Sequence, residues 1–144
     1  MQPIIKIVKG NYGEIYQAAV EIRKEVFILE QGVAPELELD HEDQAVYYVA
    51  YVADVAGATA RVIVERDGAW HIQRVATRKA YRSQGLASKL LQKIEQDARN
   101  QQIPYLTLGA QDQAQSFYQK LGFHVVGAGF FDAGIPHHQI QKAI

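Results

Sequence analysis

The chain has 144 residues, of which 48% are apolar, so a disordered chain is excluded and one domain with its own core is expected, spanning residues 1–144. Its net charge is −1 and its Lys and Arg residues are scattered, which argues against nucleic acid or an anionic membrane as a partner. It has no cysteine, which excludes disulfides, thiolate catalysis and Cys-ligated zinc.

The first elements are a strand and a helix. Residues 3–9 are rich in Ile and Val and predict a strand. Asn11, with Glu14 three residues later, predicts a capped start for the helix that follows, and Gly32 with Pro35 predicts its end. The helix has an apolar stripe made of Ile15, Ala18, Ala19, Ile22, Val26 and Leu29, and a charged face made of Glu21, Arg23, Lys24 and Glu25.

An acidic segment follows at residues 36–43. It contains the carboxylates Glu36, Glu38, Asp40, Glu42 and Asp43. Two interpretations are open: a solvated loop or short helix, or a negative rim that attracts a cationic substrate. The ligand spacing and central glycine of an EF-hand calcium loop are missing, so we expect no metal site.

Three antiparallel strands are predicted next. Residues 45–53 and 59–65 are rich in Val, Tyr and Ile and form a predicted hairpin around residues 54–57, and Asp67-Gly68 predicts a second turn. In the third strand, residues 69–77, the apolar alternation changes face before Val75. A β-bulge near Gln73 or Arg74 would explain this slip, and so would a strand that is buried on both faces.

A long amphipathic helix is predicted after this strand. Its apolar residues Ala87, Leu90, Leu91, Ile94 and Ala98 recur at helical spacing. The unpaired N–H groups at its start, together with the helix dipole, favour an anion such as a pyrophosphate. Gly85 would let such a group approach the backbone closely.

The last third of the chain continues with alternating elements. Residues 105–108 predict a strand parallel to 69–77, and Gly122 predicts the end of a helix at 111–121. Residues 123–126 begin another strand. We expect residues 130–136 to form a turn and 137–142 to return as an edge strand, which would leave an edge open for a homodimer.

Two separate blocks resemble one known family. The block Arg82-Ser83-Gln84-Gly85-Leu86-Ala87 matches the Arg/Gln-x-x-Gly-x-Gly/Ala signature of the GNAT N-acetyltransferases. The block 117–123, with the sequence FYQKLGF, matches a second hallmark of the family. The pattern at residues 26–33, together with 134–137, is similar to a bacterial subgroup of the ElaA and YjcF type. The resemblance implies an α/β (α+β) fold with a mixed, mostly antiparallel sheet flanked by helices.

The resemblance also implies a cofactor and the residues that bind it. The co-substrate would be acetyl-CoA, with its pyrophosphate on Arg82, Ser83, Gln84, Gly85, Leu86 and Ala87. The main chain of Val75, Ala76 and Thr77 would hold the pantetheine arm. Gln111 stands where relatives commonly carry an Asn that contacts the cofactor, and it keeps the amide. Neither a Walker-type phosphate loop nor a Rossmann fingerprint is present.

Two proton-transfer roles are expected for this chemistry. The resemblance gives the general acid as Tyr118, whose alternative role is packing beside Phe117. For the general base, many relatives have a carboxylate on the central strand, where this chain has Gln73 and Arg74. The remaining candidates are Glu30, Asp40, Asp132 and His137, of which His137 has a suitable ordinary pKa of about 6.5.

The expected activity is transfer of acetyl from acetyl-CoA to a primary amine by direct attack in a ternary complex. The acceptor would be a small molecule or a peptide. The alternative is a non-catalytic module that binds acyl-CoA and has lost the base. Residues 1–10 gain charge too soon for a signal peptide, and no apolar run could cross a bilayer, so we expect a cytoplasmic protein.

Overall fold

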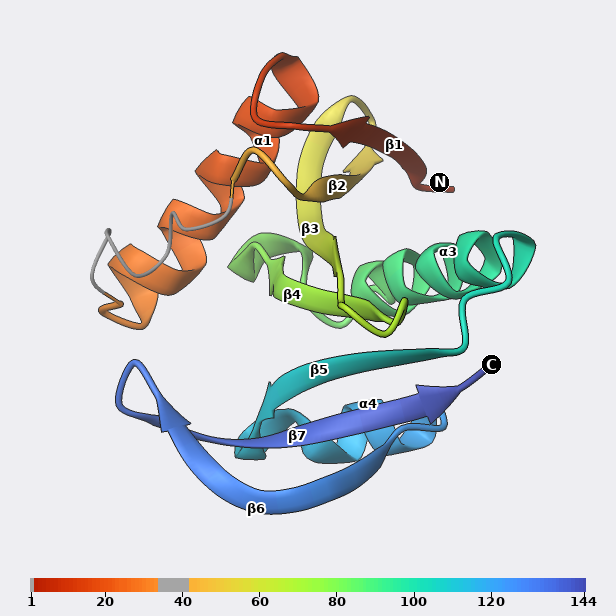
Figure 1. Ribbon diagram of the computed structural model, residues 1–144. Coiled ribbons are helices and arrows are strands. Elements are labelled where there is room, and N and C mark those ends of the chain that lie inside the picture. Colours follow the sequence, from red (N-terminus) through yellow and green to blue (C-terminus); the bar gives the residue numbers. More distant parts are fainter. Residues whose placement is uncertain (1, 34–41) are drawn as a thin grey trace.

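The computed structural model describes residues 2–33 and 42–144, which fold around one seven-stranded sheet (Figure 1). The strand order is β1-β2-β3-β4-β5-β7-β6. Only the β4–β5 pair is parallel among the described strands, so the predicted mixed, mostly antiparallel sheet is confirmed. The strands are β1 (Ile4–Lys9), β2 (Val46–Val52), β3 (Val55–Val64), β4 (Trp70–Thr77), β5 (Tyr105–Gln111), β6 (His124–Asp132) and β7 (Ile135–Ala143).

Helices cover both faces of the sheet. One face packs against α1 (Glu14–Arg23), which continues as the π-helix η1 (Lys24–Glu30). The other face packs against α3 (Leu86–Asn100) and α4 (Gln115–Lys120). Short 3₁₀ turns, η2 (Lys79–Tyr81) and η3 (Asp112–Ala114), precede these two helices. Strand alternation divides the core, because Tyr47 and Val49 belong to the α1 side and Tyr48 and Ala50 to the α3 side.

Few backbone pairs join the two halves of the sheet at its centre. Strands β4 and β5 pair only at Trp70–Leu106 and His71–Thr107 within residues 42–144. Figure 1 shows β4 and β5 diverging from this junction, so that the sheet forms two arms. We call β1–β4 with α1, η1 and α3 the N-terminal arm, and β5–β7 with α4 the C-terminal arm. The predicted parallel pairing is confirmed, and it is restricted to one end of the strands.

A buried ion cluster stabilises the N-terminal arm. Glu42 accepts from Arg23 at 3.0 Å and from Arg61 at 2.6 Å, and both guanidinium groups are 1% exposed. The hydroxyls of Tyr16 and Tyr47 donate to the same carboxylate at 3.0 and 2.8 Å. Burial opposes ionisation of Glu42, but Arg23 and the hydrogen bonds still hold its pKa below the usual range. This carboxylate is therefore structural rather than part of a solvated rim.

The first helix differs from its prediction at both ends. It begins at Glu14 after Gly13, without a side-chain cap, so the prediction that Asn11 caps it was wrong. Arg23 is buried although it was predicted to face water, and Leu29 is 81% exposed although it was predicted on the apolar stripe. Arg23 is buried because Glu42 neutralises it. Leu29 is displaced because the wider turns of η1 rotate the later residues out of phase with a 3.6-residue period.

The C-terminal strands also differ from their prediction. β7 lies between β5 and β6, so residues 137–142 are an internal strand and β6 is the edge. Residues 130–132 belong to β6, and the turn is restricted to Ala133 and Gly134, both with positive φ. The pairing of β6 with β7 is interrupted between Val126 and Phe130, where the glycines of β6 lie. These glycines break the strand pattern in the sequence, so the strand was predicted too short. The turn of the first hairpin is also shorter than predicted, since Ala53 and Asp54 form it alone.

Candidate active site

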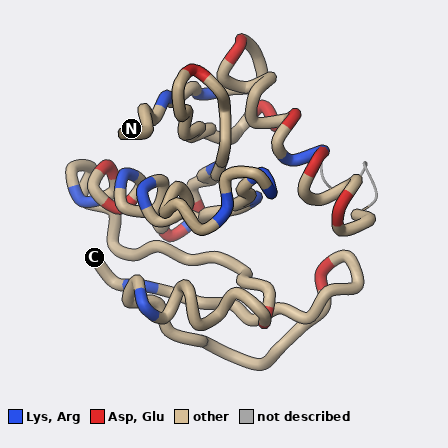
Figure 2. The backbone as a smooth tube through the Cα atoms, turned by 180° about the vertical axis from the view of Figure 1, so that it is seen from behind, with Lys and Arg blue, Asp and Glu red and all other residues tan. Residues whose placement is uncertain are grey.

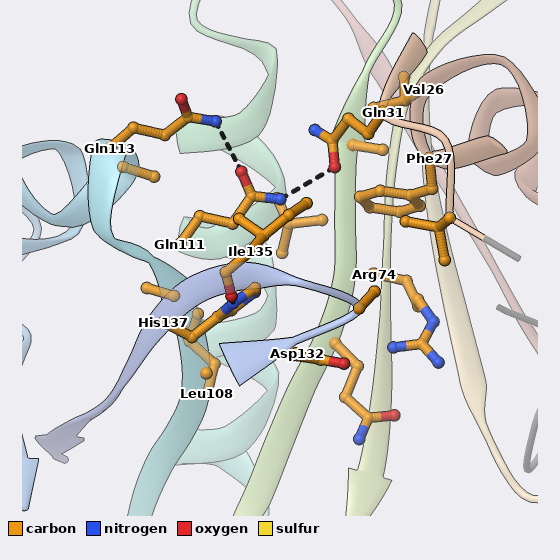
Figure 3. Close-up of a pocket in the computed structure, with 18 of the residues that line it drawn as sticks. Val26, Phe27, Gln31, Arg74, Leu108, Gln111, Gln113, Asp132, Ile135 and His137 are labelled. Carbon is orange, nitrogen blue, oxygen red and sulfur yellow. Dashed lines mark hydrogen bonds between the residues drawn. The ribbon is translucent and has the colours of Figure 1, made fainter. Parts of the chain in front are cut away.

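A cavity of about 560 Å³ lies where the two arms separate (Figure 3). The N-terminal arm contributes residues 71–77 of β4 and the end of η1, and the C-terminal arm contributes residues 108–111 of β5 and the β6–β7 turn. The cavity therefore has one wall from each arm. Eight of the predicted site residues line it: Glu30, Val75, Ala76, Thr77, Arg82, Gln111, Tyr118 and His137.

A bulge in β4 shapes the first wall. Thr59 pairs with Ala76 while Arg61 pairs with Gln73, so Arg74 and Val75 both lie opposite Ala60 and β4 has one extra residue. Arg74 has φ +54°, a left-handed conformation that is uncommon outside glycine. The bulge predicted near Gln73 or Arg74 is thus confirmed. It releases the main chain around Val75 from the ladder with β3, on the side where β4 and β5 diverge.

A second cavity, of about 290 Å³, lies at the start of α3. It is lined by Arg82, Ser83, Gly85, Leu86 and Ala87, with Phe117 opposite, and it shares Thr77 and Arg82 with the first cavity. Ser83 and Gly85 have φ of 64° and 78°, which turns the loop around the helix N-terminus.

This second cavity fits a pyrophosphate. The N–H groups in the first turn of the 15-residue helix α3 have no partner within it, and they favour an anion together with the helix dipole. We call the loop 82–87, which borders this cavity, the cradle; Gly85 adds no side chain to it. Gln84 lines neither cavity, and its side chain donates to Ala80 O at 3.3 Å instead. The binding role of the loop stays a prediction, with Gln84 contributing through its main chain.

Glu30 and Arg82 form an ion pair beside both cavities. Arg82 donates from Nη1 and Nη2 to the two carboxylate oxygens of Glu30 at 2.8 and 2.6 Å, and from Nε to Thr77 O at 3.0 Å. The hydrogen bond from Arg82 holds the pKa of Glu30 below its usual range. A carboxylate with a lowered pKa is a weaker base, so this contact counts against Glu30 as a general base in the geometry observed.

Tyr118 is buried at the floor of the first cavity. Its ring makes edge contacts with Phe117 and Phe123 at centroid distances of 5.0 and 5.9 Å. Burial raises the pKa of its hydroxyl, which keeps the phenol protonated at neutral pH. Both predicted roles of Tyr118, packing and proton donation, are compatible with this placement.

His137 lies on β7 between the cavity walls. It is 8% exposed, and its ring stacks on Phe130 with 5.7 Å between centroids. Its Nδ1 lies 2.7 Å from Ile135 O. A carbonyl oxygen can only accept, so Nδ1 carries the proton and Nε2 of the neutral ring keeps its lone pair. The surroundings of His137 therefore fix a tautomer that can accept a proton at Nε2.

A chain of amides crosses the cavity. Gln113 Nε2 donates to Gln111 Oε1 at 2.7 Å, and Gln111 Nε2 donates to Gln31 Oε1 at 3.0 Å (Figure 3). Gln31 caps η1 and Gln111 ends β5, so this bond connects the two arms. No motif or spacing marked Gln31 as a site residue, because the pattern assigned it to the helix end. The contact predicted between Gln111 and the cofactor stays a prediction.

Gln73, which stands where many relatives have a carboxylate, has a structural role. Gln73 Oε1 accepts from Arg61 Nε at 3.0 Å and from Nη2 at 2.8 Å, so the amide belongs to the edge of the buried ion cluster. Among the other base candidates, Asp132 lines the first cavity (Figure 3). Asp40, and with it most of the acidic segment 36–43, falls outside the described residues, as do Glu36, Glu38 and His41.

The comparisons with known proteins agree with this architecture. The family described as Acetyltransferase (GNAT) domain matches residues 15–144. This chain is a member of the GNAT acetyltransferases. The GNAT fold and an N-acetyltransferase activity follow from that membership, and the family transfers acyl groups from acyl-CoA.

Individual relatives agree with the family assignment. The uncharacterized N-acetyltransferase YjcF of Bacillus subtilis is 33% identical over 140 residues, which cover 96% of this chain and 99% of YjcF. An acyl-CoA N-acyltransferase from Pseudomonas aeruginosa has a TM-score of 0.85 at 26% identity, with 99% and 100% of the two chains covered. Escherichia coli ElaA has a TM-score of 0.83 at 25% identity, covering 98% and 99%. The ElaA and YjcF subgroup is thereby confirmed.

Within residues 2–33 and 42–144, every helix of this GNAT protein is too short or too polar to span a bilayer.

Proposed function

We propose that this GNAT protein transfers acetyl from acetyl-CoA to a primary amine by direct attack in a ternary complex. The observation that carries the proposal is a pair of adjacent cavities that share lining residues. One lies at the start of α3 and would hold a pyrophosphate, and the other has walls from both arms. Thr77 and Arg82 belong to both cavities, so one extended ligand can reach from the cradle to the junction. A second ligand can then enter the larger cavity beside it.

The residues fall into binding and proton-transfer roles. The loop from Arg82 to Ala87 would hold the pyrophosphate, and the bulged main chain at residues 75–77 would hold and polarise the thioester arm. When bound, acetyl-CoA supplies an activated acetyl thioester. The amine must arrive neutral and the sulfur must leave protonated, so the chain has to accept one proton and donate another.

His137 and Tyr118 are the groups placed for these transfers. His137 Nε2 has the free lone pair and would accept the proton that the acceptor nitrogen loses as its bond to the acetyl carbon forms. The Tyr118 hydroxyl, kept protonated by burial, would donate to the sulfur as the carbon–sulfur bond breaks. The raised pKa makes this donation uphill, so we expect it to be concerted with departure of the sulfur.

The acceptor would be a small-molecule or peptide amine. The second candidate function is an acyl-CoA-binding module without turnover, and its motivation is Gln73 at the position of the missing strand carboxylate. The homodimer stays a prediction. Its exposed edge would be β6 instead of residues 137–142.

Turnover across a panel of amines tests the proposal. We expect acetyl-CoA consumption with at least one primary amine, and Tyr118→Phe should lower kcat by about 100-fold or more with CoA affinity unchanged. Tyr105→Phe is the matched control, because it removes a hydroxyl that donates to Asp67 away from both cavities. CoA binding without turnover on any amine would favour the binding module. A Tyr118→Phe variant with full kcat would refute the acid role.

A further inference from the structure

The contact between Glu30 and Arg82 places a carboxylate beside the predicted pyrophosphate cradle. Arg82 lines both cavities, whereas Glu30 lines only the larger cavity. A pyrophosphate and the Glu30 carboxylate are both anions, and the guanidinium fork of Arg82 fits either of them. In the observed structure both Nη atoms of Arg82 are engaged by Glu30.

The ion pair is exposed enough to exchange. The side chains of Arg82 and Glu30 are 39% and 41% exposed. Ion pairs at this exposure contribute little to stability, because water and salt screen them. The third donor of Arg82, Nε, bonds to Thr77 O and so holds the guanidinium at the junction of the two cavities. Arg82 can therefore exchange one anionic partner for another while its guanidinium stays at the junction of the two cavities.

We propose that the acyl-CoA pyrophosphate displaces Glu30 from Arg82 and leaves the Glu30 carboxylate facing the larger cavity, where the acceptor would bind. This inference rests on the proposed function. Glu30 competes with the cofactor before binding, and it attracts the ammonium form of the acceptor afterwards. The exchange favours binding of acyl-CoA before the amine, because the carboxylate is released from its ion pair only after Arg82 has changed partner.

The contrasting role is a static clamp, in which Glu30 holds Arg82 so that the loop keeps its shape. The two roles predict opposite signs for Glu30→Gln. Removal of a competitor strengthens CoA binding, whereas removal of a clamp weakens it. Pantetheine, which lacks the pyrophosphate, separates the effect on Arg82 from any general change in the cavity.

Calorimetric titration of wild type and Glu30→Gln with CoA and with pantetheine tests the proposal. We expect Glu30→Gln to lower the Kd for CoA by roughly threefold and to leave the Kd for pantetheine unchanged. Glu21→Gln is the matched control, because it removes a carboxylate of the preceding helix α1 that pairs with Arg78 at 3.9 Å, outside both cavities. Its CoA affinity should equal that of the wild type.

Other outcomes overturn the exchange. Weaker or equal CoA binding by Glu30→Gln contradicts it, and so does an equal gain for pantetheine. If Glu30→Gln fails to fold, Arg82→Gln carries the test, since it must weaken CoA binding and leave pantetheine binding unchanged. With any amine found in the turnover panel, Glu30→Gln should raise the KM for the amine, and an unchanged KM contradicts delivery of the carboxylate. Wild type that binds no CoA would instead refute the proposed function.

Discussion

The two arms of the sheet differ in the way they use charge. The N-terminal arm contains the buried cluster around Glu42 and the Glu30–Arg82 pair. Charged residues of both signs are frequent along its helices (Figure 2). Residues 101–144, in contrast, include only Asp112, Lys120, Asp132 and Lys142 as Asp, Glu, Lys or Arg. Their cavity wall is made of amides, aliphatic side chains and rings, and Asp132 is the one Asp, Glu, Lys or Arg that they contribute to it.

This difference suggests a division of labour. The proposed cofactor cradle depends on the position of its backbone N–H groups. The N-terminal arm, which contains this loop, is stabilised by the buried ion pairs of Glu42. The C-terminal arm is joined to it by two residue pairs of β4 and β5 and by the polar contacts Gln31–Gln111, Asp67–Tyr105 and Glu95–Lys142. Its edge strand β6 exposes Phe131 at 77%. Variants of the N-terminal arm should therefore change stability and cofactor binding, and variants of the C-terminal arm should change the acceptor.

The largest expected effect is loss of the buried cluster. Glu42→Gln removes the charge shared by Arg23 and Arg61, and we expect unfolding free energy to fall by about 3 kcal/mol, as when one member of a buried ion pair is removed. Urea unfolding measures this loss. Glu95→Gln is the control on the surface, since it faces Arg99 and Lys142, and it should cost about 1 kcal/mol or less.

The same cluster predicts the acid limit of stability. The folded-state pKa of Glu42 is lowered, so its contribution is present above the unfolded value of 4.5 and is lost as the pH falls through the folded pKa. The gap between wild type and Glu42→Gln should narrow below pH 4.5. A gap that stays constant there would contradict the assigned charge.

The next effect concerns the cradle. Gly85→Val places a β-branched residue at φ +78°, so we expect the loop to change shape and CoA affinity to fall by about 10-fold or more. Gly68→Val is a matched control, because Gly68 has φ +90°, equally open surroundings and a place outside both cavities. Both variants should lose stability, and only the first should lose affinity for CoA in a binding titration.

Two glycines sharpen the contrast between the arms. A Cβ at Gly57 of β3 would lie 2.9 Å from Leu86 Cδ1 and 3.0 Å from Tyr81 Cγ, so Gly57→Ala should push the cradle loop outward. A Cβ at Gly109 of β5 would lie 3.2 Å from Phe130 Cζ. We expect Gly57→Ala to cost about 1 kcal/mol of stability and to raise the Kd for CoA.

Gly109→Ala should instead raise the KM for the amine with little change in the Kd for CoA, because Phe130 lines the acceptor side of the cavity. Steady-state kinetics with both substrates varied separates the two constants. Equal effects of both variants on both substrates would remove the division between the arms.

The smallest effect is expected at the amide chain. Gln31→Ala breaks the bond to Gln111 between the arms, and about 1 kcal/mol or less should be lost in thermal unfolding. Gln113→Ala is its control, since that residue bonds Gln111 within the C-terminal arm. A larger loss for Gln113→Ala would show that the chain stabilises β5 rather than the junction.

The sequence predicted most of the fold because its local signals agree. Regular alternation, the turn at Asp67-Gly68 and the helical stripe ending at Ala98 each depend on neighbours in the chain, and the structure confirms these elements. The bulge near Arg74 could be predicted because it also leaves a local signal, a break in the alternation of apolar residues along β4.

The failures have a different physical origin. Burial of Arg23 depends on Glu42, which is distant in sequence, and no local pattern marks that partnership. The insertion of β7 between β5 and β6 depends on strand pairing after a glycine-rich bulge, which breaks the periodicity of β6. The contact of Glu30 with Arg82 arises only when the end of η1 meets the loop before α3, and that of Gln31 with Gln111 only when it meets the end of β5.

The junction at Trp70–Leu106 and His71–Thr107 has one more consequence. Because β4 and β5 pair at one end only, the distance between them at the other end is set by side-chain packing and not by ladder hydrogen bonds. A few substitutions on β6 and β7 can then widen or narrow the acceptor cavity while β1–β4 keep their pairing. Such a junction would let a lineage change the size of the proposed acceptor while the loop proposed to bind acyl-CoA stays as it is.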